Sequence, residues 1–190
     1  YGSFGSLEEV SIEEAKRQFE VNVFGLARLI QLVLPGMRQQ RSGRIINISS
    51  MGGRFGEPHG AWYHATKFAL EGLSDSLRME LKQFNIDVIV IQPGAIASEW
   101  SDIAAGNLVK VSGQGPYKEL ALKHAALLRE TYKRASPPLV IARTILKAAT
   151  ASRPRTRYAA GAGARLLLFV RKLLPDRVFD AVFLSQIKNK

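Results

Sequence analysis

Cysteine is absent from this chain of 190 residues, and its absence excludes several kinds of site at once. Without thiols there is no disulfide framework, no thiolate-bound metal and no cysteine nucleophile, which suits a reducing cytoplasm. Long apolar runs are missing too, because the longest, 166–170, ends at Arg171. A membrane-spanning helix needs about 20 mostly apolar residues. The sequence therefore predicts no such helix, and we identify no metal-binding motif.

The first residues lack the features with which a protein usually begins. The stretch "YGSFGSLEEV" has no initiator methionine, and it has neither the basic start nor the apolar core of a signal peptide. We therefore expect the chain to begin inside a longer protein. Its composition is ordinary, with 46% hydrophobic and 23% charged residues, and its length fits one globular domain.

Acidic residues are scarce in the C-terminal half, and this scarcity explains the formal net charge of +11. Residues 1–100 carry ten Lys and Arg against eleven Asp and Glu, whereas residues 151–190 carry nine against two. Arg153, Arg155 and Arg157 alternate along one short run. We interpret this run as a solvated face or a contact with an anionic surface, and we expect no nucleic acid as a partner.

Apolar periodicity predicts an alternation of helices and strands. Ser11 followed by Glu14 matches a capping box at the start of a helical region that ends by Gly43, and Pro35-Gly36 is expected to kink or end it. Further helices are predicted over 61–84, 137–151 and 164–190, with a break at Pro175, and strands over 44–50, 86–94 and 156–161. This order predicts an α/β fold with a parallel sheet, helices on both faces and an edge that needs covering.

A tyrosine and a lysine follow the first strand at a spacing that has chemical meaning. Tyr63 and Lys67 lie four residues apart and share one face of a helix. A nearby ammonium lowers a tyrosine pKa from about 10, which makes the hydroxyl a better acid or base near neutral pH. Ser50, at the end of the strand, could hold a substrate oxygen. Alone, each residue is more simply explained as a surface side chain or a cap.

The combination of motifs is more specific than any one of them. "NVFG" contains Asn22, Ser50 ends "NISS" thirteen residues before Tyr63, "YHATK" follows, and "QPGAIAS" ends the next strand. This arrangement resembles the short-chain dehydrogenase/reductase family, in its larger classical group. The resemblance is tight over about residues 1–100 and continues loosely to "RYAAG". It implies a Rossmann-like, doubly wound parallel sheet in three layers.

The resemblance implies a role for each matching residue. Tyr63 would be the general acid/base, Lys67 would tune it and bind the nicotinamide ribose, and Ser50 would orient the substrate carbonyl. Asn22 would hold a water that links Lys67 to solvent, and asparagine indeed fits poorly inside a helix. The cofactor-binding residues would be Tyr63, Lys67, Pro93, Gly94, Ile96 and Ser98, with serine at 98 where the family usually has threonine.

The glycine-rich turn that binds the cofactor pyrophosphate in this family is missing from the sequence. No T-G-x-x-x-G-x-G segment is present, and "GAGAR" at 161–165 follows the wrong elements. We therefore expect a fold that is incomplete at its N-terminal half, with about 90 residues needed upstream. The cofactor would be NAD or NADP, with NADP slightly preferred. The chain alone is expected to be inactive and poorly soluble.

The family pattern also divides the chain and implies partners. Residues 1–160 would be the C-terminal portion of the oxidoreductase domain, with 1–100 as the catalytic core and 99–135 either as an apolar, mobile substrate lid or as a packed surface loop. The lid would offer Trp100, Ile103, Leu108, Val109, Val111 and Tyr117 to a lipophilic alcohol or ketone. The helices that carry Asn22 and Tyr63 would form a homodimer or tetramer surface.

Residues 161–190 would form an amphipathic basic tail. This tail either packs on its own domain or a partner subunit, which we prefer, or touches a membrane through 165–190. We accordingly expect a cytoplasmic protein with membrane association as the alternative. A second reading of the whole chain is a truncated α/β scaffold or binding module that kept the fold and lost catalysis.

Overall fold

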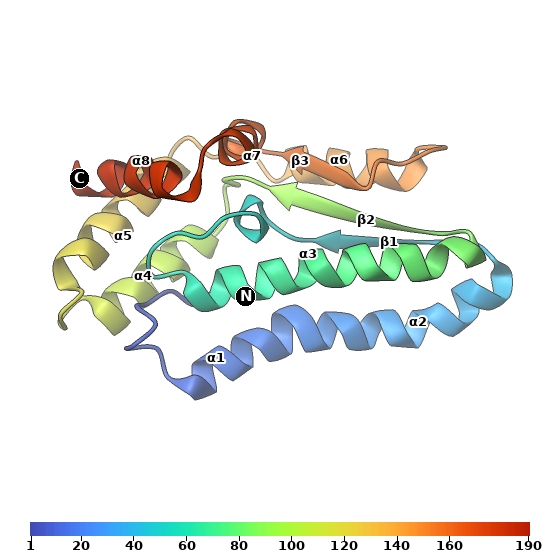
Figure 1. Ribbon diagram of the computed structural model, residues 1–190, viewed down its shortest axis with the longest axis horizontal. Helices are drawn as coiled ribbons and strands as arrows, with labels where there is room; N and C mark the ends of the chain where they lie inside the picture. Colours follow the sequence, from blue (N-terminus) through green and yellow to red (C-terminus); the bar gives the residue numbers. More distant parts are fainter.

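The computed structural model describes residues 1–190 and confirms the predicted alternation of helices and strands. Figure 1 shows the order of the elements along the chain. The α-helices are α1 (Ile12–Phe19), α2 (Leu26–Gln40), α3 (Ala61–Leu81), α4 (Trp100–Ser112), α5 (Lys118–Tyr132), α6 (Leu139–Thr150), α7 (Ala164–Leu173) and α8 (Asp176–Lys188). The strands are β1 (Gly43–Ile48), β2 (Ile86–Pro93) and β3 (Arg157–Ala160). A π-helix (Glu20–Gly25) joins α1 to α2, and short 3-10 helices follow β1 (Met51–Gly53) and α3 (Lys82–Phe84).

The three strands form one parallel sheet in the order β1-β2-β3. Gly43 of β1 lies opposite Ile86, and Val90 lies opposite Arg157, so β2 is the central strand. β2 is almost wholly buried, as its run of apolar residues predicts for a strand covered on both faces. β1 pairs only with β2, so its second edge has no neighbouring strand.

Helices cover both faces of the sheet and make three layers (Figure 1). On one face, α2 and α3 pack on β1 and β2 around a core that includes Ile30, Ile45, Leu81, Ile86 and Val88. On the other face, α6 packs on the sheet through a core of Ile89, Ile91 and Ala148. The predicted doubly wound α/β architecture is therefore confirmed, with a sheet of three strands.

The first helix begins and the helical region ends where predicted, and of the two options for Pro35-Gly36 the structure excludes an end of the helix there. Ser11 Oγ accepts a hydrogen bond from the backbone N–H of Glu14 at 3.2 Å, which is one half of a capping box. Pro35 lies inside α2, which continues to Gln40. Gln31 and Pro35 are both exposed, so the carbonyl that proline leaves free faces water.

Three helices from the C-terminal half, α4, α5 and α8, lie beside the end of the sheet where its strands finish (Figure 1). α4 and α5 lie side by side and share an apolar core that includes Phe4, Tyr63, Ala104, Leu108 and Ala125. α8 packs on α5. Its Phe179 is buried and lies 5.3 Å from the ring of Phe55, measured between ring centroids. The tail therefore packs on its own domain over α8, and its break at Pro175 is confirmed.

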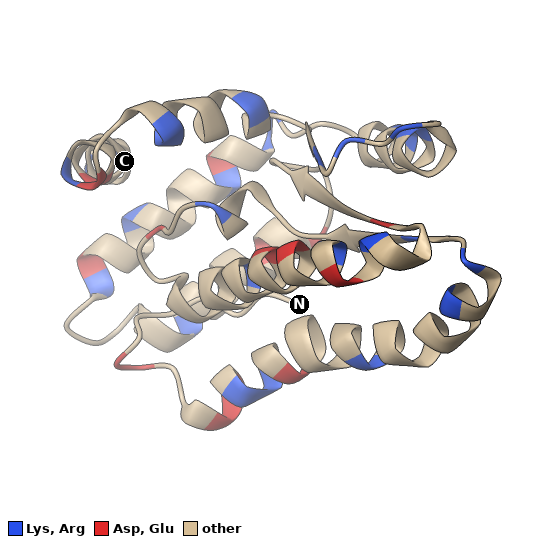
Figure 2. Cartoon of the chain, turned by 45° about the vertical axis from the view of Figure 1, so that its right-hand side comes forward, with Lys and Arg blue, Asp and Glu red and all other residues tan.

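The basic residues of the C-terminal half do not form one uniform face (Figure 2). Arg153 and Arg155 are exposed, as a solvated run predicts. Arg157 differs, because its guanidinium donates to Glu71 and to Asp75, at 2.8 Å in each case. Glu71 is 3% exposed and belongs to α3, so Arg157 of β3 neutralises a buried carboxylate. The interpretation of the whole arginine run as a solvated face was therefore wrong for Arg157.

Candidate active site

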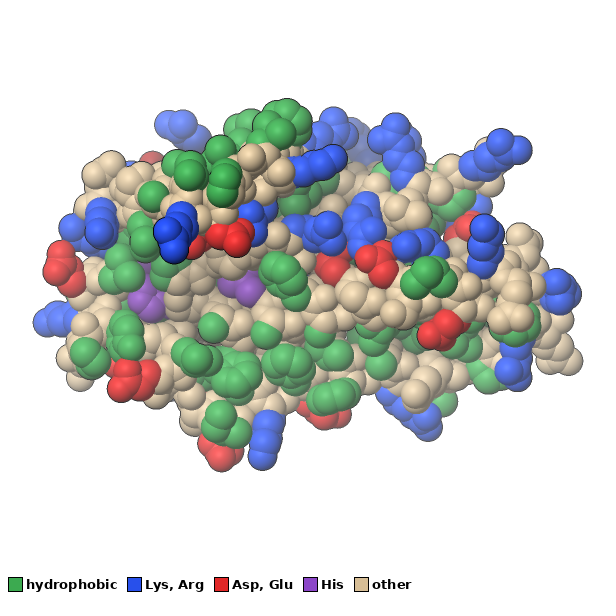
Figure 3. Space-filling model, in the orientation of Figure 1, with side chains coloured by type: hydrophobic (Ala, Val, Ile, Leu, Met, Phe, Trp, Pro, Cys, Tyr) green, Lys and Arg blue, Asp and Glu red, His purple; other side chains and the backbone are tan.

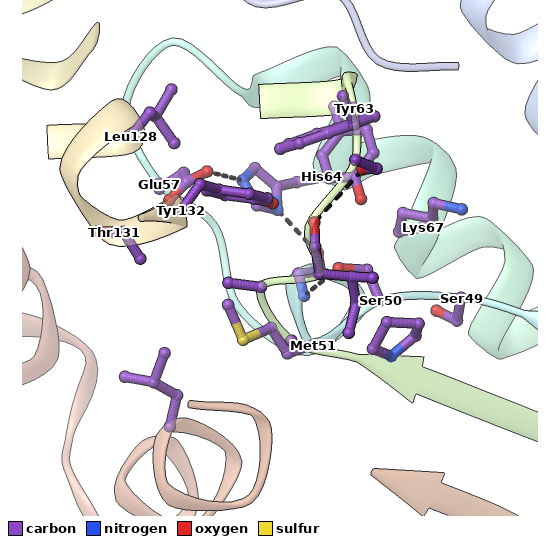
Figure 4. Close-up of a pocket in the computed structure, with 18 of the residues that line it drawn as sticks. Ser49, Ser50, Met51, Glu57, Tyr63, His64, Lys67, Leu128, Thr131 and Tyr132 are labelled. Carbon is purple, nitrogen blue, oxygen red and sulfur yellow. Dashed lines mark hydrogen bonds and ion pairs between the residues drawn. The ribbon is translucent and has the colours of Figure 1, made fainter. Parts of the chain in front are cut away.

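A cavity of about 620 Å³ opens where β1 and β2 end, and Figure 4 shows the side chains around it. Open α/β sheets place their ligands at this edge. The structure brings seven of the eight residues predicted from the sequence to the cavity wall. They are Ser50, Tyr63, Lys67, Pro93, Gly94, Ile96 and Ser98. Asn22 is the exception and lies behind the wall.

Tyr63 sits in the first turn of α3 with its ring packed into the core. The ring lies 5.6 Å from that of Phe4 and 5.4 Å from that of Trp100, centroid to centroid, and the residue is 8% exposed. Burial raises the pKa of Tyr63 to about 12, against the opposing hydrogen bond with Ser50, while the Glu57 carboxylate also raises it. The direction is opposite to the expected lowering, because desolvation of the phenolate outweighs the hydrogen bond with Ser50.

Lys67 lies one turn further along α3 and reaches the same cavity. Its Nζ is 5.9 Å from the centre of the Tyr63 ring and donates to the carbonyl of Ile48 at 3.1 Å. Burial lowers the pKa of Lys67 to about 8. An ammonium has three N–H donors, so two remain after the bond to Ile48. Lys67 can therefore hold hydroxyl groups of a ligand in the cavity.

Ser50 is held in place by the short helix that it caps. Its Oγ accepts a hydrogen bond from the backbone N–H of Gly52 at 3.0 Å. The neighbouring Ser49 donates its backbone N–H to the carbonyl of Ile91, which extends the β1–β2 pairing by one bond. The Oγ of Ser49 is buried and has no hydrogen-bond partner. A turn cap was the simpler explanation for Ser50, and the structure shows the cap and the cavity position together.

Asn22 lies in the π-helix, 8% exposed. Its Nδ2 donates to the carbonyl of Tyr1 at 2.9 Å and to Oγ1 of Thr66, on α3, at 3.1 Å. A π-helix is rare and frequently occurs at functional sites. The misfit of asparagine inside a helix was the visible signal, whereas the widened turn could not be predicted from periodicity.

Gly94 follows the last residue of β2 and has a packing reason to be glycine. A Cβ at this position would lie 2.1 Å from the carbonyl oxygen of Ala162. The backbone after β3 therefore approaches too closely for any side chain. Just beyond, Ser98 donates its hydroxyl to the carbonyl of Ile96 at 3.3 Å. Pro93-Gly94 thus does more than end a strand, because it lets two chain segments meet beside the cavity.

The residues on the wall are suited to the nicotinamide half of a dinucleotide. Lys67 offers free N–H donors for ribose hydroxyls, and the segment from Pro93 to Ser98 offers a narrow backbone surface beside them. No glycine-rich turn at a helix N-terminus lines the cavity, so the wall has no group of this kind to bind the pyrophosphate. The residues of the wall therefore fit the nicotinamide half of the dinucleotide and not its pyrophosphate.

Sequence reasoning missed most of the remaining wall. Of the six apolar residues expected in a lid over 99–135, only Trp100 lines the cavity, since Leu108 is fully buried and Ile103 is exposed. The later helices supply the apolar side chains, including Leu127 and Leu128 of α5. The others are Ile141, Ala142, Ile145, Leu167 and Phe183. Their distance in sequence from Tyr63 left no signal by which to find them.

Three polar residues of the wall were missed as well, namely Glu57, His64 and His124. His64 and His124 place their Nε2 atoms 3.7 and 3.9 Å from the Glu57 carboxylate. The position of His64 directly after Tyr63 was a signal that could have drawn attention. The approach of Glu57 to His124, 67 positions later, is a product of the tertiary structure.

The comparisons with known proteins agree with this geometry. A model of short chain dehydrogenases matches residues 2–105. The probable short-chain type dehydrogenase/reductase VdlC of Helicobacter pylori is 36% identical over 183 residues, covering 96% of this chain and 67% of that protein. A 3-ketodihydrosphingosine reductase of Bacteroides thetaiotaomicron is 34% identical over 181 residues, covering 94% and 66%.

A solved structure supports the same relationship. The crystal structure of a short-chain dehydrogenase from Streptomyces avermitilis matches with a TM-score of 0.74 and 29% identity, over 99% of this chain and 65% of that one. The chain therefore spans about two thirds of the length of these proteins. The family match covers more than half of the chain and includes Asn22, Ser50, Tyr63, Lys67 and Gly94. The chain belongs to the short-chain dehydrogenase family.

Proposed function

We propose that the protein containing this chain is an NAD- or NADP-dependent oxidoreductase that interconverts an alcohol and a ketone or aldehyde. The observation that carries the proposal is the convergence of Ser50, Tyr63 and Lys67 on one cavity beside the end of β2. The Tyr63 hydroxyl, with the Lys67 ammonium and the Ser50 hydroxyl beside it, is placed for proton transfer to or from a substrate oxygen. NADP remains the slightly preferred cofactor.

Tyr63 is the proton donor in the reducing direction. Its pKa, raised to about 12 by burial, keeps the hydroxyl protonated near neutral pH until a ligand changes its surroundings. Ser50 orients the substrate oxygen through its hydroxyl, and Lys67 holds its ammonium on the same side of α3. The nicotinamide, when bound, supplies or accepts the hydride at carbon. Lys67, Pro93, Gly94, Ile96 and Ser98 would hold its ribose and ring.

Asn22 is proposed to connect Lys67 with solvent through a water. The support is its burial beside Tyr1 and Thr66 and its place one helix away from Lys67. The proton that Tyr63 gives to the substrate oxygen must be replaced in each turnover. A chain through Lys67 and Asn22 would return it without opening the apolar side of the cavity.

The substrate is proposed to be lipophilic. Sixteen of the 29 residues that line the cavity are hydrophobic, and those from α5, α6, α7 and α8 face the site of chemistry from several sides. A volume of about 620 Å³ has room for a substrate beside the nicotinamide end of the cofactor. The apolar wall thus favours a ketone or alcohol on a long chain or a fused ring.

The substitution Tyr63→Phe in the protein containing this chain tests the mechanism. It removes one hydroxyl and keeps the ring that packs on Phe4 and Trp100. We expect kcat to fall by at least about a hundredfold, the usual contribution of general acid–base catalysis, with cofactor affinity nearly unchanged. Stopped-flow absorbance of the reduced cofactor and fluorescence titration measure the two quantities.

The result also separates the enzyme from a scaffold. Retention of full turnover by Tyr63→Phe would show that Tyr63 is not the proton donor. Absence of turnover and of cofactor binding in the unmodified protein would favour the alternative function, a non-catalytic binding module. Tyr117, which lies outside the cavity wall and donates its hydroxyl to Glu8 at 2.8 Å, provides a matched control, since Tyr117→Phe should leave kcat unchanged.

A further inference from the structure

All three histidines of the chain gather around the Glu57 carboxylate. Figure 4 shows Glu57 and His64 on the side of the cavity away from Lys67. Glu57 and His59 come from the loop before α3, His64 comes from α3, and His124 comes from α5. His59 Nδ1 lies 3.2 Å from His124 Nδ1, and His64 and His124 both aim Nε2 at Glu57. The proposed proton transfer at Tyr63 uses none of these groups. They form a polar cluster that is separate from Ser50, Tyr63 and Lys67.

Hydrogen-bonding rules determine where the hydrogen on His64 lies. Its Nδ1 is 2.7 Å from the carbonyl oxygen of Gly52, which can only accept, so Nδ1 carries the hydrogen. In the neutral ring, Nε2 then presents a lone pair to the Glu57 carboxylate. Two acceptors that face each other across 3.7 Å repel unless a donor or a proton comes between them. Burial opposes a charged ring, but Glu57 outweighs it and raises the pKa of His64.

His59 and His124 provide no charge to balance Glu57. Burial and the neighbouring His124 lower the pKa of His59 to about 4. Burial likewise lowers the pKa of His124, with His64 acting in the same direction against the pull of Glu57. Both rings are therefore neutral near pH 7. Burial raises the pKa of the Glu57 carboxyl, but the hydrogen-bonding contact with His64 and the charge of that ring are the main opposing causes and the net direction is downward, so the carboxylate is ionised.

Two nitrogens of the cluster are buried without a hydrogen-bond partner, and they are Nε2 of His64 and Nε2 of His124. The side chains of these two histidines are 7% and 1% exposed. Both histidines and Glu57 are among the residues that line the cavity, and the two Nε2 atoms lie just beneath its surface. The gaps to Glu57 are too long for direct hydrogen bonds. The cluster is not placed to hold a metal ion.

We propose that Glu57, His64 and His124 form a subsite for a primary ammonium group on the substrate. An ammonium has three N–H donors and no acceptor, so it can donate to the Glu57 carboxylate and to Nε2 of neutral His64 together. It thereby replaces the proton that would otherwise sit on His64. The inference rests on the proposed oxidoreductase function and makes its substrate an amino alcohol or amino ketone with an apolar chain.

The charges of the cluster favour a cation over the other polar groups. An anion would meet the ionised Glu57 directly. A hydroxyl has one donor and leaves the carboxylate without a counter-charge when His64 is neutral. Charge-assisted hydrogen bonds are about twice as strong as neutral ones, and burial away from water strengthens them further. The apolar residues nearby, Leu128 and Phe55 among them, would contact the chain that carries the ammonium.

Calorimetric titration with octylamine, octanol and octanoate at pH 7.5 tests this selectivity without cofactor or turnover. We expect octylamine to bind at least about tenfold more tightly than octanol, and octanoate to bind most weakly. Glu57→Gln should bring octylamine and octanol within about twofold of each other. Glu130→Gln is the matched control, because Glu130 is an exposed acid of α5 that pairs with Lys133 at 2.8 Å. It should keep the preference intact.

A second measurement needs no substitution near the cavity. The ring of His64 is faced by Glu57 from the loop and by His124 from α5, and NMR reports its titration directly. Octylamine should shift the His64 titration to lower pH, since the cation takes the place of the proton, whereas octanol should leave it unmoved. Equal shifts with both ligands would overturn the ammonium subsite, as would a preference for octylamine that survives Glu57→Gln.

The two proposals fail in different ways. Tyr63→Phe should bind octylamine as the unmodified protein does, because Tyr63 contributes no charge to the cluster. A preserved octylamine preference without hydride transfer would contradict the oxidoreductase function and support the cation site. Turnover of uncharged ketones with no octylamine preference would support the oxidoreductase function and contradict the cation site.

Discussion

Lys67 holds a charge in surroundings that disfavour it. Burial lowers its pKa from 10.5 to about 8, so the folded protein binds this proton less tightly than the unfolded chain does. Lys67→Met should therefore raise the free energy of unfolding at pH 7 by roughly 2 kcal/mol, after allowance for the partial exposure of the side chain. Urea unfolding at pH 7 measures this gain, and the same variant should lose turnover.

The sign of the pH dependence follows from the same shift. Below pH 8 the ammonium is charged in both states, and its full burial cost opposes folding. As pH rises from 8 to 10.5, the folded protein loses the proton first, and the cost fades. The stability gain of Lys67→Met should therefore shrink toward zero at pH 10.5. Lys82→Met, at an exposed position after α3, should change stability little at either pH.

Among the secondary-structure elements, α3, β2 and β3 are joined by one polar connection. Arg157 of β3 bonds Glu71 and Asp75 of α3, and Gln92 of β2 donates to the other Glu71 oxygen at 2.9 Å. Glu71 is 3% exposed, so it depends on these partners. Arg157→Ala should lower the free energy of unfolding by about 3 kcal/mol, because it leaves a buried carboxylate without its cation.

Urea denaturation followed by circular dichroism measures this loss. Arg153→Ala is the control, since Arg153 lies on the same run and is exposed. The connection also holds β3 against β2, next to the turn where Gly94 meets Ala162. A loss of stability no greater than that of Arg153→Ala would show that solvent compensates Glu71 and that the connection is not structural.

Across the whole molecule, apolar side chains gather over α1, α2 and α3 on one face (Figure 3). Leu29 and Leu32 of α2 are 66% and 60% exposed, and Phe24 and Phe68 continue the patch. Patches of this kind mark interfaces, and we expect a homodimer or tetramer through this face. Leu29→Glu with Leu32→Glu should lower the oligomer mass found by sedimentation.

Leu166→Glu, on the exposed apolar side of α7, is the matched control for the oligomer. An unmodified protein that sediments as a monomer would contradict the expected interface, and so would an unchanged mass in the double variant. The same helical stretch, 12–40, is long and apolar enough to cross a membrane by length and composition alone, with 11% of its most apolar window buried. This length and composition are weak evidence for a membrane span, because a helix at a subunit interface can have them too.

The tail carries a second whole-molecule prediction. α8 buries Phe179 and Ile187 in its own domain, while α7 exposes Leu166, Phe169 and Leu173 beside basic residues. If α7 touches anionic membranes, Leu166→Ser with Phe169→Ser should reduce cosedimentation with anionic liposomes severalfold. Equal cosedimentation of the variant and the unmodified protein would contradict membrane contact. Deletion of 165–190 is a poorer test, because it removes core residues.

Local patterns in the sequence determined the elements and half of the site. Short apolar runs and helical spacing predicted all three strands and most of the helices, because both depend on residues close in sequence, whereas α4 and α5 fall where a mobile lid was expected. Ser50, Tyr63 and Lys67 were found for the same reason, since they lie within one strand, loop and helix. The π-helix between α1 and α2 was not found, because one widened turn leaves no periodic signal.

Only the tertiary structure decided which distant residues meet at the cavity and what charges they carry. The pKa of Tyr63 rises because the ring is buried against Phe4 and Trp100, a neighbourhood that no spacing reveals. Glu57 meets His124 because α5 folds back across the loop, and Arg157 meets Glu71 because β3 joins the sheet beside β2. Sequence periodicity reports which face of an element is buried, whereas desolvation and pairing depend on what is packed against that face.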